Sequence, residues 1–289
     1  MKRVLVLGGT GMLGHFVVRT LSGLKDIKVK YTEKGDENSP FYFNVENGIN
    51  QLHAIIKSSG YFDYVINCIG ILSNNIDKRN PDSVRNAILV NGLFPHDLIK
   101  LGNELGFRII HISTDGVFSK SAGLCLEDSI QFCEDIYGKT KNMGEGFSPQ
   151  LLNVRCSIIG PSPFKKNGLM EWFLKQPKGA EVNGYTDHMW NGATTLQLAR
   201  LCYIIITKNC FHLIRNEAPA HHFCPNHPIS KFDLLRLFKT QLRPDIKVMP
   251  VNSPDGPLSR VLETRYIQIK KLFGNKVQVC DALKILMNK

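Results

Sequence analysis

The sequence has no apolar run that approaches the ~20 residues needed to cross a bilayer. The longest candidate, from Leu196 to Thr207, is interrupted by Gln197 and Arg200, so we expect a buried helix there. No hydrophobic signal segment precedes the first strand-like residues at the N-terminus. We therefore expect a cytoplasmic protein without a membrane partner.

The eight cysteines show no paired spacing of the kind that marks a disulfide framework. Free thiols in a reducing compartment are the simpler interpretation. One segment, His221-His222-Phe223-Cys224-Pro225-Asn226-His227, contains residue types that suit zinc. These residues crowd a single short loop, and no second half of a zinc site appears elsewhere. We expect no metal, and interpret the segment as a loop leading into a helix that starts near Ser230.

Acidic residues are in the minority, with 25 Asp and Glu against 36 Lys and Arg, and the formal net charge is +11. Nucleic-acid binding is one explanation of such an excess. The basic residues are dispersed, however, and no RNA-binding motif rich in aromatic residues is visible. A basic surface also suits anionic small molecules such as a dinucleotide or a nucleotide-linked sugar. We expect the latter partners and no nucleic acid.

The first motif follows a short apolar run, Lys2 to Leu7, and reads Gly8-Gly9-Thr10-Gly11-Met12-Leu13-Gly14. A helical pattern comes next, and strand, glycine turn and helix in this order are typical of a dinucleotide site. The helix N-terminus would face the phosphates with its free N–H groups. The spacing is G-x-x-G-x-x-G, and a glycine turn without a ligand is the alternative. The cofactor-binding residues expected here are Gly8, Thr10, Gly11, Met12, Leu13 and Gly14.

The second motif joins Ser113-Thr114-Asp115 to Tyr137, with Lys141 four residues further on. A helix would place Tyr137 and Lys141 on one face. A lysine beside a tyrosine favours the phenolate, so we expect a lowered phenol pKa and a general acid at Tyr137. An ordinary pair on a helix surface is the alternative interpretation of Tyr-x-x-x-Lys alone.

The first half of the chain alternates strand-like and helix-like segments, which predicts an α/β fold, a Rossmann-type doubly wound parallel sheet. We expect a helix over 193–207, a last strand over 210–215, and a small C-terminal substrate-binding lobe. The dinucleotide-binding domain would take residues 1–160 with 186–220, and the lobe 161–185 with 221–289. The expected strands are 3–7, 27–32, 63–69, 107–113 and 151–157, and the expected helices are 12–23, 47–58, 82–105 and 136–146.

Other strand ends add expectations about the cofactor. Thr32 stands where an acidic residue would bind a bare ribose 2′-hydroxyl, and Lys34 is near, which favours NADP(H). The acidic residue next to it, Glu33, leaves NAD(H) as the alternative cofactor. Asn44 and Val45, after a further short strand, are expected at the adenine. Cys68, Ile69 and Gly70, which follow the third strand, are expected near the nicotinamide half. Asn91, inside the long helix, is expected to hold the active-site strand in place.

Together these motifs resemble the extended short-chain dehydrogenase/reductase superfamily, and within it the dTDP-4-dehydrorhamnose reductase family of sugar-nucleotide ketoreductases. The resemblance implies that Thr114 and Tyr137 hold the 4-keto oxygen of the sugar and that Tyr137 and Lys141 also contact the cofactor. These three residues would be catalytic. The residues expected to contact the substrate are Ser113, Thr114, Asp115, Trp190 and Asn191.

The resemblance implies NADPH-dependent reduction of a nucleotide-linked 4-keto-6-deoxy sugar in deoxysugar or polysaccharide biosynthesis, by an enzyme that could form a homodimer. Related dehydratases carry Thr-Asp-Glu, whereas this chain has Gly116 in the third position, and glycine cannot move a proton. Ile158 stands where the family's reductases often carry a tryptophan in the substrate pocket, so the sequence does not predict which sugar is bound. A 4-epimerase or epimerase/reductase, and a regulatory subunit without turnover, are the alternatives.

Overall fold

The first strand shows how the sequence builds two layers of core around one sheet. In this computed structural model, which describes residues 1–288, β1 (Lys2–Leu7) is buried from its third residue onward. Val4 and Val6 pack into one hydrophobic cluster, whereas Leu5 and Leu7 pack into another. Successive side chains of a strand point to opposite faces, so an unbroken apolar run predicts a sheet covered on both sides.

The central sheet has six parallel strands in the order β11-β6-β4-β3-β1-β2. The order reverses at β1 and β3, and ligands of such sheets bind at the carboxyl ends next to the reversal. The expected Rossmann-type α/β fold is confirmed. The remaining strands of this sheet are β2 (Ile27–Tyr31), β3 (Tyr64–Asn67), β4 (Arg108–Ser113), β6 (Leu151–Arg155) and β11 (Ala220–His222).

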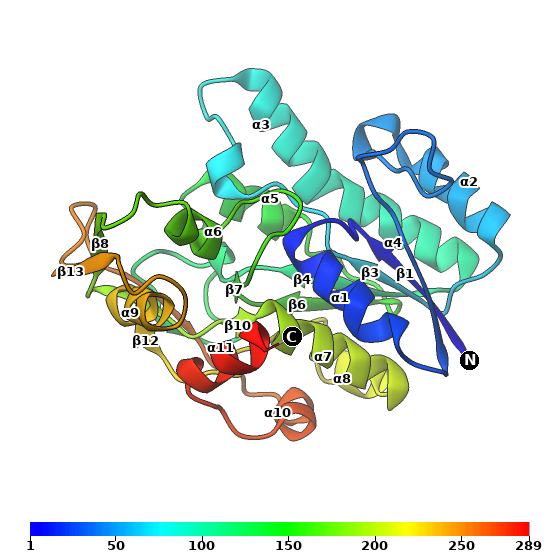
Figure 1. Cartoon of the computed structure of the whole chain (residues 1–289). Coiled ribbons are helices and arrows are strands. Elements are labelled where there is room, and N and C mark those ends of the chain that lie inside the picture. The colour runs from blue at the N-terminus through cyan, green and yellow to red at the C-terminus, as the bar shows by residue number, and fades with distance from the viewer. Residues whose placement is uncertain (289) are drawn as a thin grey trace.

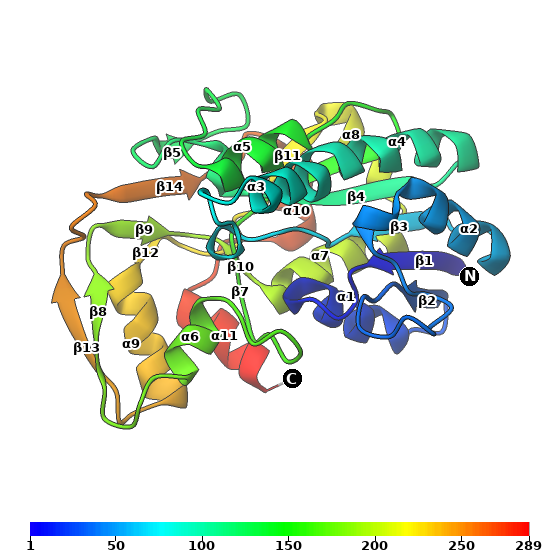
Figure 2. The same ribbon diagram turned by 90° about the horizontal axis from the view of Figure 1, so that it is seen from above.

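Helices cover both faces of the sheet (Figure 2). On one face α1 (Met12–Ser22) packs along α7 (Thr195–Thr207), and their apolar residues share a cluster. The other face carries α2 (Ile49–Ser59), α4 (Phe94–Leu105) and α5 (Ile136–Met143). Because α5 follows the carboxyl end of β4, its first turns lie at the edge where ligands are expected.

A smaller lobe lies beside the sheet, at the left of Figures 1 and 2. Its four-stranded sheet has the order β12-β9-β14-β5, and β8 pairs with β13. One of its strands, β5, comes from the first half of the chain. The domain boundaries expected from the sequence remain a prediction. The lobe strands are β5 (Gly123–Cys125), β8 (Glu181–Tyr185), β9 (His188–Trp190), β12 (Ile229–Ser230), β13 (Lys247–Val251) and β14 (Leu258–Leu262); its helices are α6 (Leu169–Leu174), α9 (Lys231–Leu242) and α11 (Val279–Met287). Helix α10 (Ile267–Phe273) packs instead against α7, beside the large sheet. A separate pair joins β7 (Ile158–Ile159) to β10 (Ala193–Thr194).

Three elements differ from the expectations. The strand expected over 210–215 is a helix, α8 (Phe211–Glu217), because Phe211 and Ile214, three residues apart, are buried on one helical face. The last strand of the sheet is β11 instead, so His221 and His222 lie in a strand rather than a loop. The helix expected over 82–105 consists of α3 (Pro81–Ala87), the π-helical turn η3 (Ile88–Leu93) and α4.

Among residues 1–288, no helix is both long and apolar enough to cross a membrane.

Candidate functional site

The glycine motif forms a tight loop between β1 and α1. Gly8 adopts a positive φ of 75°, and its N–H donates to the Thr32 hydroxyl at 3.0 Å. A Cβ at Gly14 would lie 2.1 Å from the Gly8 carbonyl oxygen, so the helix packs directly on the loop. The N-cap of α1, Gly11, has no side-chain hydrogen bond to the first turn, which leaves N–H groups of that turn free for an anion.

The expected ribose-binding residues lie after β2, beside this loop. Thr32 is 1% exposed, and its hydroxyl accepts the hydrogen bond from Gly8 N–H, so it stabilises the conformation of the glycine loop. Lys34 is exposed and lies 3.9 Å from Glu46, a weak surface ion pair. The further strand expected before Asn44 is reduced to an isolated bridge between Glu33 and Tyr42.

Asn44 and Val45, expected at the adenine, make structural contacts within the protein. Val45 is buried in the core cluster with β1, and Asn44 caps the short turn η1 (Val45–Asn47) by accepting from Glu46 N–H. Ile69, after β3, approaches the glycine loop, since a Cβ at Gly8 would lie 3.0 Å from its Cγ1. Cys68 precedes it and is partly exposed, and Gly70 is exposed.

Thr114, Asp115 and Tyr137 come together after β4. The Thr114 hydroxyl accepts from Gly116 N–H at 3.0 Å and donates to Asp115 Oδ1 at 3.1 Å. Burial raises the pKa of Tyr137 to about 12, and the neighbouring Thr114 hydroxyl partly offsets this rise. Burial also raises the pKa of Asp115, against the effect of the Arg260 guanidinium. A phenol with this pKa is protonated at neutral pH and can donate a proton.

Lys141 is 4% exposed, and its Nζ donates to the Ile112 carbonyl oxygen at 2.7 Å. Burial lowers its pKa to about 8, and the Glu145 carboxylate opposes this effect. The expectation that Lys141 lowers the phenol pKa was wrong, because burial dominates at Tyr137 and raises the pKa. Lys141 also lowers the pKa of the Cys68 thiol, against the larger effect of burial, which raises it.

The residues expected to bind substrate divide into two groups. Asp115 and Trp190 are partly exposed, whereas Thr114 is 4% exposed and its hydroxyl bonds to Asp115 and Gly116. Ser113 instead donates to Glu145 Oε1 at 2.5 Å. Asn191 is 2% exposed, and its amide donates to the Leu262 carbonyl and accepts from the Leu262 N–H. It therefore fixes β14 to the segment after β9, and we do not include it in the proposed site.

The π-helical turn η3 directs Asn91 toward the site. The Asn91 amide accepts from Ile71 N–H at 2.9 Å and donates to the Ile71 carbonyl at 3.0 Å. It also donates to the Thr140 hydroxyl at 3.2 Å. Asn91 thus ties α5 to the loop after β3, rather than to the strand that carries Thr114.

Sequence reasoning missed a buried polar network beneath these residues. Arg155, at the end of β6, binds the Glu145 carboxylate through Nε (2.9 and 3.0 Å) and Nη2 (2.6 Å). Its Nη1 donates to the Glu127 carbonyl at 3.0 Å and lies 3.4 Å from His222 Nε2. The only signal in the sequence is the four-residue spacing from Lys141 to Glu145.

The network continues into the lobe. The Glu127 carboxylate accepts from His222 N–H at 3.0 Å, from the Thr264 hydroxyl, and from Arg265 N–H at 3.2 Å. His222 is fully buried and burial lowers its pKa, so the ring is neutral. Ser113, which directly precedes Thr114, is therefore connected through Glu145, Arg155 and Glu127 to the segment after β14.

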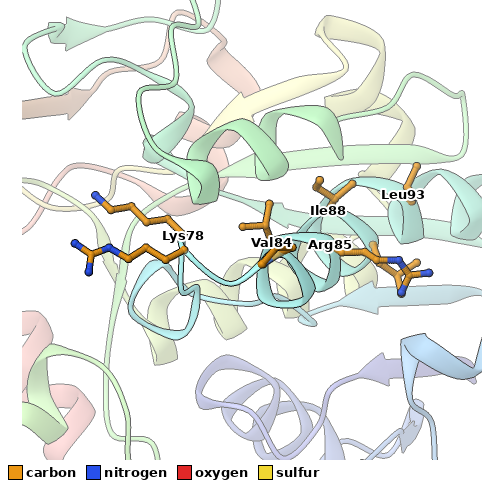
Figure 3. A pocket seen from close by; sticks show the side chains of 8 residues that line it. Lys78, Val84, Arg85, Ile88 and Leu93 are labelled. Atoms are coloured by element: carbon orange, nitrogen blue, oxygen red, sulfur yellow. The ribbon is translucent and has the colours of Figure 1, made fainter.

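Two open concavities lie elsewhere. One, of about 390 Å³, is lined by apolar residues of α3 and η3, with Lys78 and Arg85 extending toward its opposite ends (Figure 3). The other, of about 470 Å³, lies between the segment after β11 and α10. Neither is lined by Tyr137 or Lys141. Within residues 1–288, no group of three or more His, Cys, Asp or Glu side chains is arranged to hold a metal ion.

The doubly wound sheet, with a Tyr-x-x-x-Lys helix at its carboxyl edge, defines the class as a Rossmann-type oxidoreductase. The chain belongs to the family described as the RmlD substrate binding domain, whose model matches residues 1–260. The resemblance to dTDP-4-dehydrorhamnose reductases is thus confirmed at the level of the family. None of the curated proteins matches the sequence.

Solved structures share the fold over nearly the whole length. A dTDP-4-dehydrorhamnose reductase from Yersinia enterocolitica is 21% identical, with a TM-score of 0.78 and coverage of 100% of this chain and 99% of the other. The Clostridium acetobutylicum enzyme is 22% identical, with a TM-score of 0.74 and coverage of 99% and 98%. That from Bacillus anthracis, in complex with NADP, is 17% identical, with a TM-score of 0.79 and coverage of 100% and 99%.

Proposed function

We propose that this protein reduces the 4-keto group of a nucleotide-linked 6-deoxy sugar with NADPH. The observation that carries the proposal is the position of the Lys141 ammonium. It is buried on the helix that carries Tyr137 and donates to the Ile112 carbonyl near the carboxyl end of β4, two residues before Thr114, where a shared site for a nicotinamide ribose and a ketone would need it. Membership of the family supports the same substrate class.

The residues around the glycine loop fit a dinucleotide. A Cβ at Gly11 would meet only the Gly8 carbonyl oxygen, at 3.2 Å, and would otherwise occupy open space above the loop. The uncapped first turn of α1 supplies N–H donors for the pyrophosphate. Thr32 and the exposed Lys34 favour NADPH, since no carboxylate stands at position 32 to repel a 2′-phosphate. The bound cofactor supplies the hydride for the keto carbon.

In the proposed mechanism each side chain has one task. Tyr137, protonated at neutral pH, donates a hydrogen bond and then its proton to the keto oxygen. Thr114 orients that oxygen with its hydroxyl, which donates to Asp115 Oδ1 when no substrate is bound. Lys141 presents its remaining N–H donors to the ribose hydroxyls, because only one of its protons is taken by the Ile112 carbonyl. Asp115 and Trp190 are proposed to contact the sugar.

The test uses purified protein, NADPH and a panel of nucleotide-linked 4-keto-6-deoxy sugars. Oxidation of NADPH should require the sugar, and Tyr137→Phe should reduce turnover by about a hundredfold or more while NADPH binding stays nearly intact. Turnover unchanged by this substitution would exclude the proposed role of Tyr137. Conversion of the sugar without net consumption of NADPH would indicate an epimerase. Absence of turnover across the panel, with a stoichiometric partner enzyme, would indicate a regulatory subunit.

We also propose a homodimer as the assembled form. The contact that we assign to it is an apolar surface on η3 and α5, where Leu93 and Met143 are 51% and 52% exposed. Measurement of the molar mass by light scattering would test this proposal, and a monomer across the accessible concentration range would contradict it.

A further inference from the structure

The strongest unassigned feature is the guanidinium of Arg260, at the centre of the lobe strand β14. Its Nε is buried and has no hydrogen-bond partner. Within residues 1–288 the side chain also forms no ion pair with a carboxylate. A buried donor without an acceptor is costly, and an arginine keeps its charge throughout the neutral range. Arg260 therefore calls for an acceptor from outside the chain.

The alternation of side chains along β14 directs Arg260 toward the candidate site. Arg260 and Leu262 are two residues apart, so their side chains share one face of the strand. Leu262 is 1% exposed and packs with Val117, the last residue of the short turn η4 (Asp115–Val117). The turn η4 itself lies against β14. The guanidinium is thus on the side of Asp115, and in agreement its charge opposes the rise in the pKa of that carboxyl.

The strands on either side of β14 carry no acidic residue at the level of Arg260. On β5 the partner of Arg260 is Gly123, which has no side chain. On β9 Met189 pairs with Ser259, so the next position in the same register is Trp190. Arg260 therefore lies between a glycine and a residue that is proposed to contact the sugar.

Two other guanidinium groups near the site are already neutralised. Arg155 binds the Glu145 carboxylate, with its Nη2 at 2.6 Å. Arg265, five residues after Arg260, pairs with Asp128 at 2.8 Å. Of these three groups, only that of Arg260 is available to an anion that enters the site from the lobe.

We propose that Arg260 binds the diphosphate of the nucleotide-linked sugar. This inference rests on the proposed function, which puts the keto sugar at Thr114 and Tyr137 and the cofactor at the glycine loop. The remainder of the substrate then extends toward the lobe, where β14 lies against η4. A guanidinium suits this task because it presents two parallel N–H donors to phosphate oxygens.

The test measures binding of two probes, thymidine diphosphate and uridine diphosphate, by titration calorimetry in protein without cofactor. We expect Arg260→Gln to weaken binding of the diphosphate by about tenfold or more. Arg260→Lys keeps a point charge but loses the paired donors, so its affinity should be intermediate. Affinity for NADPH, measured by fluorescence, should be equal in all three proteins. Arg200→Gln is the matched control, because Arg200 is also partly exposed but lies on α7, which packs against α1; it should bind the diphosphate like the wild type.

Thermal unfolding separates a binding role from a structural one. Arg260→Gln should unfold at the wild-type temperature, because its removal leaves no group of the described chain without an ion-pair partner. Should this variant not fold, Arg260→Lys alone decides, through an affinity below that of the wild type. Wild-type affinity for the diphosphate in a folded variant, an equal loss of affinity for NADPH, or no binding of either probe by the wild type would overturn the proposal.

Failure of this inference can be distinguished from failure of the proposed reductase activity. Binding of a diphosphate that depends on Arg260, without turnover of any sugar in the panel, would support the inference and contradict the reductase. Turnover by Arg260→Gln with an unchanged KM for the sugar nucleotide would support the reductase and overturn the inference.

Discussion

Gly138 lies against the backbone of Gly116, so closely that a Cβ at Gly138 would lie 2.2 Å from the Gly116 carbonyl oxygen. Gly138 is in the first turn of α5, directly after Tyr137, and Gly116 follows the Thr114-Asp115 pair. The contact sets how far the phenol lies from the Thr114 hydroxyl. Two glycines that carry no chemistry thus fix the distance between two residues proposed to act on the same oxygen.

Gly138→Ala should therefore damage both stability and turnover. The methyl group cannot be accommodated without moving the loop after β4, and we expect a loss of about 1–3 kcal/mol in the free energy of unfolding. Turnover should fall further than NADPH affinity, since the displaced residues are the ones proposed to contact the ketone. Urea denaturation and steady-state kinetics measure the two effects. Gly23→Ala is the control, because no atom lies within 4 Å of its Cβ position; equal effects of both substitutions would refute the close-packing argument.

The buried Lys141 should make stability depend on pH in the alkaline range. Its pKa is lowered from 10.5 to about 8 in the folded state, so between these values the unfolded chain binds more protons. The free energy of unfolding then gains a contribution that rises with pH, by up to roughly 3 kcal/mol. Buried thiols and Tyr137, with raised pKa values, act in the opposite direction. The comparison with Lys141→Met isolates the lysine: the stability of the wild type relative to this variant should increase from pH 8 to pH 10.5 in urea denaturation. A constant difference would contradict the lowered pKa.

Removal of the Asn91 amide should loosen the loop after β3. Asn91→Ala leaves both backbone groups of Ile71 without their partner, and we expect a loss of about 1–3 kcal/mol. Hydrogen exchange should show faster opening of residues near Ile71. Asn50→Ala, at an exposed position of α2, should change stability by less than about 0.5 kcal/mol. If the two variants were equally stable, the amide of Asn91 would not be the tie between loop and helix.

The proposed preference for NADPH can be tested at Lys34. Lys34→Ala should weaken binding of NADPH by about fivefold, because one exposed charge near a phosphate contributes about 1 kcal/mol. Binding of NADH should be unaffected, as should binding of both cofactors to Lys28→Ala, an exposed lysine further back on β2. Fluorescence titration of the reduced nicotinamide measures these affinities at low salt. Equal losses for NADPH and NADH would argue against a 2′-phosphate contact.

The parts of the fold that could be predicted from sequence are those with strong local patterns. The run Lys2 to Leu7 followed by glycines, and the Tyr137–Lys141 spacing, each specify an element and its place at the sheet edge. The prediction of a strand over 210–215 was wrong because an apolar run this short shows too few repeats to distinguish a strand from a helix. The π-helical turn at Asn91 was missed for a related reason, since the apolar pattern of the flanking helices continues through it.

The site was harder to predict where burial and distant pairing decide the chemistry. No local pattern could show that Asn191 pairs with Leu262, or that Arg155 and Ser113 both bind Glu145. The pKa of Tyr137 was predicted in the wrong direction because spacing gives the proximity of a lysine but not the degree of burial. Charge effects follow the environment of a side chain, and that environment forms only when remote segments pack.

The strand β5 consists of three residues from the first half of the chain, and it pairs with β14 in the sheet of the lobe. A gene fragment that encodes only the later residues would therefore leave β14 with an open edge. Exchange of lobes between relatives, as a route to new sugar specificity, would have to carry residues 123–125 along with the C-terminal part. Any crossover placed between the two halves would cut through a shared sheet.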